Sequence, residues 1–363
     1  MCDAIYIHVP FCMNKCEYCD FLSFKSVGSE RDKYVEYLLK EIDLYPEYSY
    51  DSVYFGGGTP SLLKPEDIKK ILGKMKIGEG AEVTLEVNPK TVDYDKLKAL
   101  KEAGINRISI GMQSFNEKHL KTLGRLHDRG RAIETYEAGR RAGFDNISID
   151  IMFSLPNQTM EELREDLAQV KKMKPEHISI YSLIWEEGTP FFDKLERGEY
   201  SETDNDLEGE MYEEIIRELG DAGYVHYEIS NFALPGLEAR HNSKYWENRE
   251  YVGLGLGASG YLDRVRYKNI VEFESYYDKI DEKTRPVETT EEVSSEMERE
   301  YKFILGLRLL TRGVDAKGRY LDKCLELEKK GFLIRKGDKF ILSERGVFIA
   351  NNVFEEFLDL QGE

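Results

Sequence analysis

Three cysteines near the N-terminus form the densest group of metal-binding residues in the sequence. Cys12, Cys16 and Cys19 have the spacing C-x3-C-x2-C and follow a predicted strand at residues 4–9. Three thiolates can hold three irons of a [4Fe-4S] cluster and leave the fourth iron open to a ligand with nitrogen and oxygen donors. Two alternatives are a redox pair of Cys16 and Cys19, or a zinc site that adds His8. The third cysteine and the position after a strand favour the iron–sulfur interpretation.

Polar residues follow several other predicted strands. A glycine-rich run, Gly56-Gly57-Gly58-Thr59-Pro60, comes after the second strand, where glycines let a ligand approach the backbone closely. Four single side chains stand at or near later strand ends: Glu86, Gln113, Arg125 and Asp150. Each of these alone is typical of a solvated or capping residue. Together they predict a ring of polar groups at one mouth of a (β/α) barrel, where such folds place their active sites.

The elements that must position these residues alternate regularly over the first 230 residues. Runs rich in β-branched and aromatic residues predict strands at 4–9, 52–55, 82–87, 107–110, 147–151 and 177–181. Helical patterns lie between them, at 31–45, 65–74, 94–103, 131–142 and 160–173. Strands separated by helices indicate an α/β fold with parallel βαβ units. Six strand signals before residue 185 favour a partial (β/α)6 barrel as the core domain, residues 1–230.

The rest of the chain changes character. A helix is expected at 205–222 and an extended segment at 224–232. Residues 231–290 are interpreted as an irregular extension, because 240–260 are rich in Tyr, Trp, Asn and Gly. Residues 291–363 predict a small C-terminal winged-helix-like domain, with helices and a hairpin at 298–310, 318–330, 331–342 and 344–357. This unit is not notably basic, so packing or partner binding is the expected role.

Composition and charge exclude several classes of protein. The 363 residues carry a formal net charge of −18, which makes general nucleic-acid binding unfavourable. The 12% aromatic content excludes intrinsic disorder. No long apolar run or secretory signal is present, so a cytoplasmic protein is expected. An odd total of five cysteines argues against a disulfide framework, and Cys2 and Cys324 are interpreted as structural.

The cysteine pattern, with Tyr6-Ile7-His8-Val9-Pro10-Phe11-Cys12 before it and Asp20-Phe21 after it, resembles the radical S-adenosylmethionine (SAM) superfamily. Within this superfamily the chain is similar to the group of oxygen-independent coproporphyrinogen III oxidase and the heme chaperone HemW. The resemblance extends over essentially the whole chain. It implies a [4Fe-4S] cluster held by the three cysteines, a SAM molecule that the cluster reduces, and a heme or porphyrin ligand.

The same resemblance implies positions for the SAM contacts. Tyr6 would lie near the open iron, the backbone at Tyr18 would contact adenine, and Arg125 would lie near the carboxylate. Gln113 and Asp150 would lie near the ribose. The full set of residues implied to contact the cofactor is Tyr6, Tyr18, Gly57, Gly58, Thr59, Glu86, Gln113, Arg125, Asp150, Ile184 and Ser259.

Two features separate the members of the group. The oxidase carries a fourth cysteine two positions after the third, where this chain has Phe21, and it has a longer segment before the cluster. The run His241-Asn242-Ser243-Lys244-Tyr245-Trp246 matches the HNxxYW motif of HemW-type proteins. We expect His241 to serve heme, with Arg240, Lys244 and Arg249 near the propionates. The alternative is a buried histidine within an ordinary aromatic core.

These features favour a heme chaperone that passes heme to acceptor proteins, including respiratory enzymes at the membrane. The alternative is an enzyme, the oxygen-independent coproporphyrinogen III oxidase, in which a 5′-deoxyadenosyl radical abstracts hydrogen from propionate side chains. Modification of RNA fits poorly with the acidic charge. The sequence leaves open whether SAM is cleaved, how heme is attached and whether the chain forms a homodimer.

Overall fold

The computed structural model describes residues 2–358 and contains a nine-stranded sheet in the order β11-β1-β4-β5-β6-β7-β8-β10-β9. Its six consecutive central strands run parallel to one another, which confirms the predicted α/β core. They are β1 (Ala4–Val9), β4 (Ser49–Gly57), β5 (Lys76–Val87), β6 (Arg107–Gln113), β7 (Ile147–Phe153) and β8 (His177–Ser182). The carboxyl ends of these strands therefore meet at one edge of the sheet.

Shorter strands extend this arc on both sides. β11 (Val252–Leu254) runs parallel to β1, although it comes almost 250 residues later in the chain. On the other side, β10 (Asn231–Ala233) pairs antiparallel with β8, and β9 (Val225–Glu228) pairs antiparallel with β10. The extended segment expected at 224–232 is thus two strands separated by a turn. β11 and β9 end the sheet, which makes it the partial barrel that the six strand signals predict.

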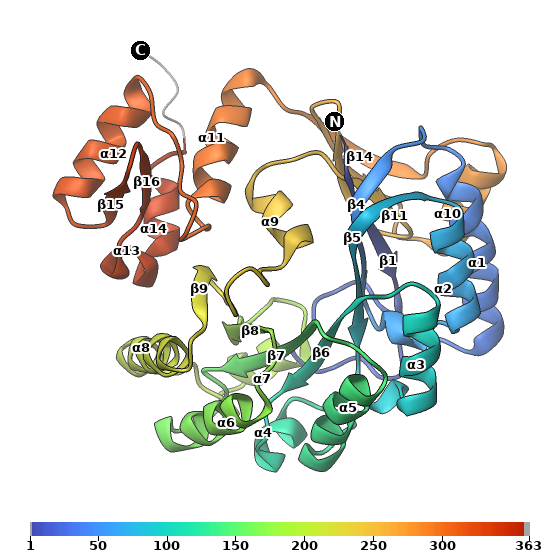
Figure 1. The fold of residues 1–363 in the computed structure, drawn as a ribbon, viewed down its shortest axis with the longest axis horizontal. Helices are drawn as coiled ribbons and strands as arrows, with labels where there is room; N and C mark the ends of the chain where they lie inside the picture. The colour runs from blue at the N-terminus through green and yellow to red at the C-terminus, as the bar shows by residue number, and fades with distance from the viewer. Residues whose placement is uncertain (1, 359–363) are drawn as a thin grey trace.

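Helices cover the outer side of the curved sheet (Figure 1). They are α1 (Gly28–Ile42), α2 (Pro65–Gly73), α3 (Tyr94–Glu102), α4 (Glu117–Thr122), α5 (Arg129–Arg141), α6 (Met160–Met173) and α8 (Asn205–Asp221). The helix α7 (Pro190–Glu196) instead lies beside residues 12–19, where the Phe191 N–H donates to the Glu17 carbonyl at 3.1 Å. In α6 the apolar residues Leu163, Leu167 and Val170 recur at helical spacing and are buried against the sheet. Thr159 and Glu162 form a capping box that begins this helix.

Alternation along the strands separates the apolar core from the barrel interior. In β7 the buried Ile147, Ile149 and Ile151 belong to the main hydrophobic core. The residues between them, Ser148 and Asp150, point to the opposite side, because successive side chains of a strand alternate. Complete burial of each isoleucine contributes about 2 kcal/mol relative to exposure. The core thus stabilises the sheet from outside while the interior stays free for polar residues.

Residues 240–260 are not irregular, which corrects the expectation from their composition. They contain the helix α9 (Arg240–Trp246), the strand β11 and the start of β12 (Ser259–Leu262). The glycines that suggest loop structure are required by close packing instead. A Cβ atom on Gly253 would lie 1.9 Å from the Ser259 carbonyl oxygen, so only glycine fits there.

The rest of the extension is also regular. β12 pairs with β13 (Val265–Asn269), and β13 pairs with β14 (Val287–Glu292), which gives a three-stranded antiparallel sheet. The helix α10 (Phe273–Asp281) connects β13 and β14 and packs against α1. The extension therefore braces the N-terminal side of the barrel.

The C-terminal elements gather around a second hydrophobic cluster that includes Phe303, Leu327 and Phe357. They are α11 (Ser295–Gly306), α12 (Arg319–Lys329), the hairpin β15 (Leu333–Lys336) and β16 (Lys339–Leu342), α13 (Glu344–Phe348) and α14 (Ala350–Glu355). Figure 1 shows α12–α14 and the hairpin together at one side of the barrel. The division at residues 230 and 290 stays a prediction, and Met1 and 359–363 lie outside the described residues. None of the helices in residues 2–358 is long and apolar enough to span a membrane.

One buried carboxyl group ties α1 to this extension. Glu41 is 0% exposed and accepts hydrogen bonds from the Gly255 backbone N–H at 2.8 Å, the Asn269 amide at 2.9 Å and the Tyr276 hydroxyl at 2.6 Å. Burial raises the pKa of Glu41 to about 7, and the hydrogen bonds oppose this rise only in part. The folded protein therefore favours the protonated group.

We expect this carboxyl group to weaken the fold as the pH rises. The unfolded chain releases the proton near pH 4.5 and the folded chain near pH 7, so the free energy of unfolding falls between them. The size of this loss is about 3 kcal/mol at most. Glu41→Gln removes the titration. Urea unfolding at pH 5 and pH 8 should show the wild type losing stability relative to the variant; parallel pH profiles would contradict the assignment.

Candidate functional site

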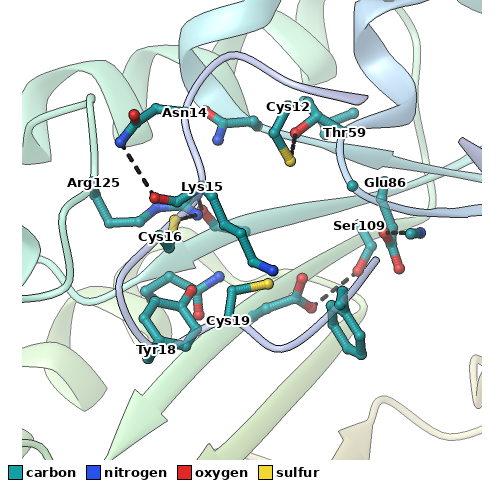
Figure 2. A pocket seen from close by; sticks show the side chains of 18 of the residues that line it. Cys12, Asn14, Lys15, Cys16, Tyr18, Cys19, Thr59, Glu86, Ser109 and Arg125 are labelled. Atoms are coloured by element: carbon teal, nitrogen blue, oxygen red, sulfur yellow. Dashed lines mark hydrogen bonds between the residues drawn. The ribbon is translucent and has the colours of Figure 1, made fainter. Parts of the chain in front are cut away.

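The cysteine loop opens at the carboxyl end of β1. The short strand β2 (Phe11–Cys12) pairs with β3 (Phe24–Lys25), and this pairing closes the loop at its base. The backbone N–H of Cys19 donates to the Cys16 carbonyl at 3.2 Å, which turns the chain back within the loop. Cys12, Cys16 and Cys19 line one pocket of about 170 Å³ (Figure 2). The structure therefore brings together the three thiols that the spacing singles out.

The arrangement does not favour the zinc alternative. The His8 ring is buried, with Nδ1 2.9 Å from the Tyr6 hydroxyl and Nε2 3.0 Å from the Leu22 carbonyl oxygen. Both ring nitrogens are engaged, so His8 does not complete a metal site with the cysteines. Within residues 2–358, no three His, Cys, Asp or Glu side chains converge as a single ion requires. A polynuclear cluster can bind thiolates that are further apart than the ligands of one zinc ion.

The thiols have different polar neighbours. Thr59 Oγ1 lies 3.4 Å from Cys12 Sγ, and Arg125 Nη1 lies 3.4 Å from Cys16 Sγ. These two sulfurs therefore each have a polar partner from another element of the barrel. Burial raises the pKa of the Cys19 thiol to about 11. This sulfur therefore ionises at neutral pH only when a metal takes the place of its proton.

The glycine-rich turn after β4 approaches the cysteine loop so closely that side chains do not fit. Gly57 has φ +111°, and a Cβ there would lie 2.5 Å from the His8 ring. A Cβ on Gly58 would lie 2.7 Å from the Phe11 carbonyl oxygen. The Gly58 N–H donates to the Val9 carbonyl at 2.9 Å, which fixes the turn against β1. The glycines thus leave backbone exposed at the pocket wall.

Two half-buried carboxyl groups, those of Glu86 and Asp150, face the pocket from the barrel interior. Glu86 accepts hydrogen bonds from the Tyr54 hydroxyl at 2.8 Å and the Gly57 N–H at 3.2 Å, and Asp150 accepts one from Ser109 at 3.0 Å. Burial raises the pKa of Glu86 to about 7 and also raises the pKa of Asp150. Two carboxyl groups with raised pKa values favour a positively charged ligand, because the ligand stabilises their ionised form.

The opposite wall is built around Arg125 and Gln113. Arg125 Nη2 donates to the Gly111 carbonyl at 2.6 Å, which holds the guanidinium beside Cys16. The pairing register shifts between Gly111 and Gln113, and Gln113 has φ +68°. Its side-chain oxygen accepts a hydrogen bond from the Tyr181 hydroxyl at 3.1 Å. Left-handed backbone at a residue other than glycine is costly and often accompanies binding sites.

The pocket brings together most residues expected to contact SAM. Beside the cysteines, its lining includes Tyr18, Gly57, Gly58, Thr59, Glu86, Gln113, Arg125 and Asp150. The described pocket lining does not include Tyr6, Ile184, Ser259 or His241. Sequence reasoning missed Ser109 of β6 and Tyr181 of β8, which also line the pocket. Alternation along β6 places Ser109 on the same side as Gly111, whereas no expected residue on β8 marks Tyr181.

His241 is buried in the interior of the barrel, away from the cysteine pocket. It is 0% exposed, its Nδ1 lies 3.0 Å from Ser52 Oγ, and its Nε2 lies 2.7 Å from the Tyr245 hydroxyl. Burial lowers the pKa of His241 to about 3, so the ring is neutral. Neither nitrogen is free for an iron atom in this arrangement. The geometry supports the alternative of a histidine buried in an aromatic core.

The cations around this motif are engaged as well. The Lys244 side chain is 5% exposed and forms ion pairs with Asp3 and Asp51. Arg249 pairs with Asp3 and Glu247. The expected propionate contacts of these two side chains would require them to leave their present partners.

The tight turn at Gly58 gives a direct test of the pocket wall. Gly58→Ala should destabilise the protein by about 2 kcal/mol and lower iron retention after anaerobic reconstitution, because the neighbouring atoms are backbone. Gly73→Ala in α2 is the matched control, since no atom lies within 4 Å of its Cβ position. Alanine should be neutral or stabilising there. Equal thermal midpoints and iron contents for both variants would contradict the packing described.

Comparison with known proteins agrees with this geometry. The family model described as the radical SAM superfamily matches residues 6–170. The heme chaperones HemW of Lactococcus lactis and Bacillus subtilis are each 36% identical to this chain. The alignments cover 98% of this chain and 97% and 99% of the two relatives, respectively.

A solved structure shares the fold. Coproporphyrinogen III oxidase (HemN) from Escherichia coli, described as a radical SAM enzyme, superposes with a TM-score of 0.84 at 21% identity. The superposition covers 99% of this chain and 91% of the oxidase. At this identity the likeness shows the fold alone. The sequence identity of 36% over nearly the whole chain is with the chaperones, and the protein therefore belongs to the HemW family within the radical SAM superfamily.

Proposed function

We propose that this protein is a heme chaperone that binds a [4Fe-4S] cluster, SAM and heme, and passes heme to acceptor proteins. The observation that carries the proposal is the 36% identity to two heme chaperones HemW over nearly their full lengths. The thiols and carboxyl groups of the pocket supply chemistry that suits the first two ligands. We further propose that the protein works in the cytoplasm, where its thiols stay reduced, and that its acceptors include respiratory enzymes at the membrane.

The three cysteines are the residues that would hold the cluster. A bound cluster would supply an electron to SAM through the iron that lacks a cysteine ligand. Arg125 beside Cys16 and Thr59 beside Cys12 would stabilise negative charge on the sulfurs. The pairing of β2 with β3 closes the base of the cysteine loop. This pairing would keep the three cysteines oriented toward the cluster without a fourth protein ligand.

The charges of the pocket match those of SAM. SAM carries an α-ammonium group, a sulfonium and a carboxylate. Glu86 and Asp150 present half-buried carboxyl groups toward the positive charges, and Arg125 presents a guanidinium on the other wall. Gly57 and Gly58 line the pocket without side chains, which lets the methionyl part approach the backbone closely. This complementarity supports the proposed assignment of the pocket.

The alternative is oxygen-independent coproporphyrinogen III oxidation. The likeness to HemN favours it only at the level of the fold. The side chain at the position of the oxidase's fourth cysteine is Phe21, which is 62% exposed at the pocket. An exposed phenyl group supplies no ligand or acid–base group there. The chaperone is therefore the first proposal.

We predict that SAM binding depends on the charge of Glu86. A cationic ligand binds the ionised carboxylate, whereas the ligand-free pocket holds the proton up to about pH 7. SAM should therefore bind about tenfold more weakly at pH 6 than at pH 8. Glu86→Gln should bind weakly and lose this pH dependence in equilibrium dialysis of the reconstituted protein.

The matched control for that experiment is Glu41→Gln. Glu41 titrates in the same range but lies outside the pocket, so this variant should keep the wild-type pH profile of SAM binding. A flat wild-type profile would show that Glu86 does not face the cation. If the Glu41 variant also lost the pH dependence of SAM binding, that dependence would arise from the stability of the fold rather than from the pocket.

Heme binding and transfer test the proposed function itself. Hemin titrated into the anaerobically reconstituted protein should give a saturable Soret change at one heme per chain, and apomyoglobin should then withdraw that heme. Binding no stronger than that of an unrelated acidic protein would contradict the chaperone. Release of CO2 from coproporphyrinogen III, together with SAM cleavage, would support the oxidase instead.

A further inference from the structure

The HNxxYW motif lies inside the arc of the sheet, on α9 (Figure 1). Glu82 of β5 accepts hydrogen bonds from the Arg240 N–H at 3.1 Å and the His241 N–H at 2.9 Å, so its carboxylate fixes the start of this helix. Ser52 of β4 lies 3.0 Å from His241 Nδ1. Contacts with two neighbouring strands, β4 and β5, thus fix the position of the imidazole inside the barrel.

The imidazole supports a column of aromatic rings below the pocket. Its ring stacks on Tyr54 with centroids 5.2 Å apart and an interplanar angle of 26°. Tyr54 stacks in turn on Tyr6 at 6.2 Å and 23°. Tyr54 stands two residues beyond Ser52 on β4, and side chains two residues apart share one face of a strand. The contacts thus lead from α9 toward the carboxyl edge of the sheet.

The column ends at a residue of the pocket. The Tyr54 hydroxyl donates to Glu86 Oε1 at 2.8 Å, and the other oxygen of the same carboxyl group accepts the Gly57 N–H at 3.2 Å. Glu86 lines the pocket together with Gly57. The orientation of this carboxyl group therefore depends on the position of the Tyr54 ring, and that ring rests on His241.

We propose that His241 is a positioning residue for SAM binding: its ring holds Tyr54 in place, and Tyr54 aims Glu86 at the pocket. This inference rests on the proposed function, since it takes the pocket to bind SAM. It assigns the histidine of the motif to support of the cofactor site and not to iron. Heme bound to this folded state would use other residues.

The histidines as a group agree with this assignment. Five of the six are buried, and the sixth, His226, is half-buried with Nε2 3.1 Å from the Ile229 carbonyl oxygen. An axial ligand needs a ring nitrogen that reaches the iron. The motif histidine would have to give up Ser52 or Tyr245 and move out of the barrel before it could serve in that way.

The test uses two substitutions of His241 that distinguish the role of its aromatic ring from the role of its ring nitrogens. His241→Ala removes the supporting ring, whereas His241→Phe keeps an aromatic ring but cannot bind iron. Tyr54→Phe keeps the stack and removes only the hydroxyl that reaches Glu86. His226→Ala is the matched control, because this ring also stacks on an aromatic residue, Phe232, at 4.2 Å. Circular dichroism and thermal midpoints verify the fold of each variant.

Dissociation constants for SAM and for hemin are measured on each anaerobically reconstituted protein. We expect His241→Ala and Tyr54→Phe each to weaken SAM binding about five- to tenfold, the usual effect of one lost hydrogen bond. The double variant should be no weaker than either single one, because both changes act through the same contact. His241→Phe and His226→Ala should stay within about twofold of the wild type, and hemin binding should change in none of them.

Two outcomes would overturn the inference. The first is loss of the hemin Soret change in both His241→Ala and His241→Phe with SAM affinity unchanged, which would make the histidine a heme ligand. The second is weaker SAM binding in Tyr54→Phe but not in His241→Ala, which would leave Tyr54 independent of the histidine. Failure of the wild-type protein to bind SAM would contradict the proposed function, and this inference with it.

Discussion

The structure depends on one electrostatic constraint: acidic and sulfur groups converge at one barrel mouth without enough protein cations to balance them. Three thiols, Glu86 and Asp150 line a pocket whose cations are Lys15 and Arg125, and Arg125 contacts Cys16. Burial raises the pKa values of both carboxyl groups and of the Cys19 thiol. Bound cations would stabilise the charged form of such a site.

The fold meets this constraint by keeping apolar and polar residues on opposite sides of the same strands. Isoleucines of β7 pack outward against the helices, while Ser148 and Asp150 point inward. Polar residues of the interior then hold one another through hydrogen bonds. The contacts from Glu82 to His241 and from Tyr54 to Glu86 are examples, and each satisfies a group that would otherwise be buried alone.

Much of this arrangement was predictable from the sequence because it is local. The strand at Ala4–Val9 and the helix at Met160–Met173 have the expected bounds, since alternation and capping residues mark both of them. The cysteine spacing and the strand-end residues also predicted the pocket. The polar interior was harder to foresee, because Ser109 and Tyr181 become neighbours of the pocket only when strands pair in register.

The structure around the HNxxYW motif could not be predicted from local sequence patterns. β11 has three residues, and only its pairing with β1 makes it a strand. The glycines around it are required by contacts across the chain, which a local pattern does not reveal. His241 was expected to serve heme because its motif resembles that of heme chaperones, whereas its burial follows from Ser52 and Tyr245.

The most direct test of a cluster and SAM sharing this pocket is electron paramagnetic resonance of the anaerobically reconstituted, reduced protein with and without SAM. A [4Fe-4S] cluster with one open iron should give a signal whose g values shift when SAM binds, because the ligand reaches that iron. Spectra that stay identical at saturating SAM, or a protein that retains no iron with all three cysteines present, would contradict the assignment of this site.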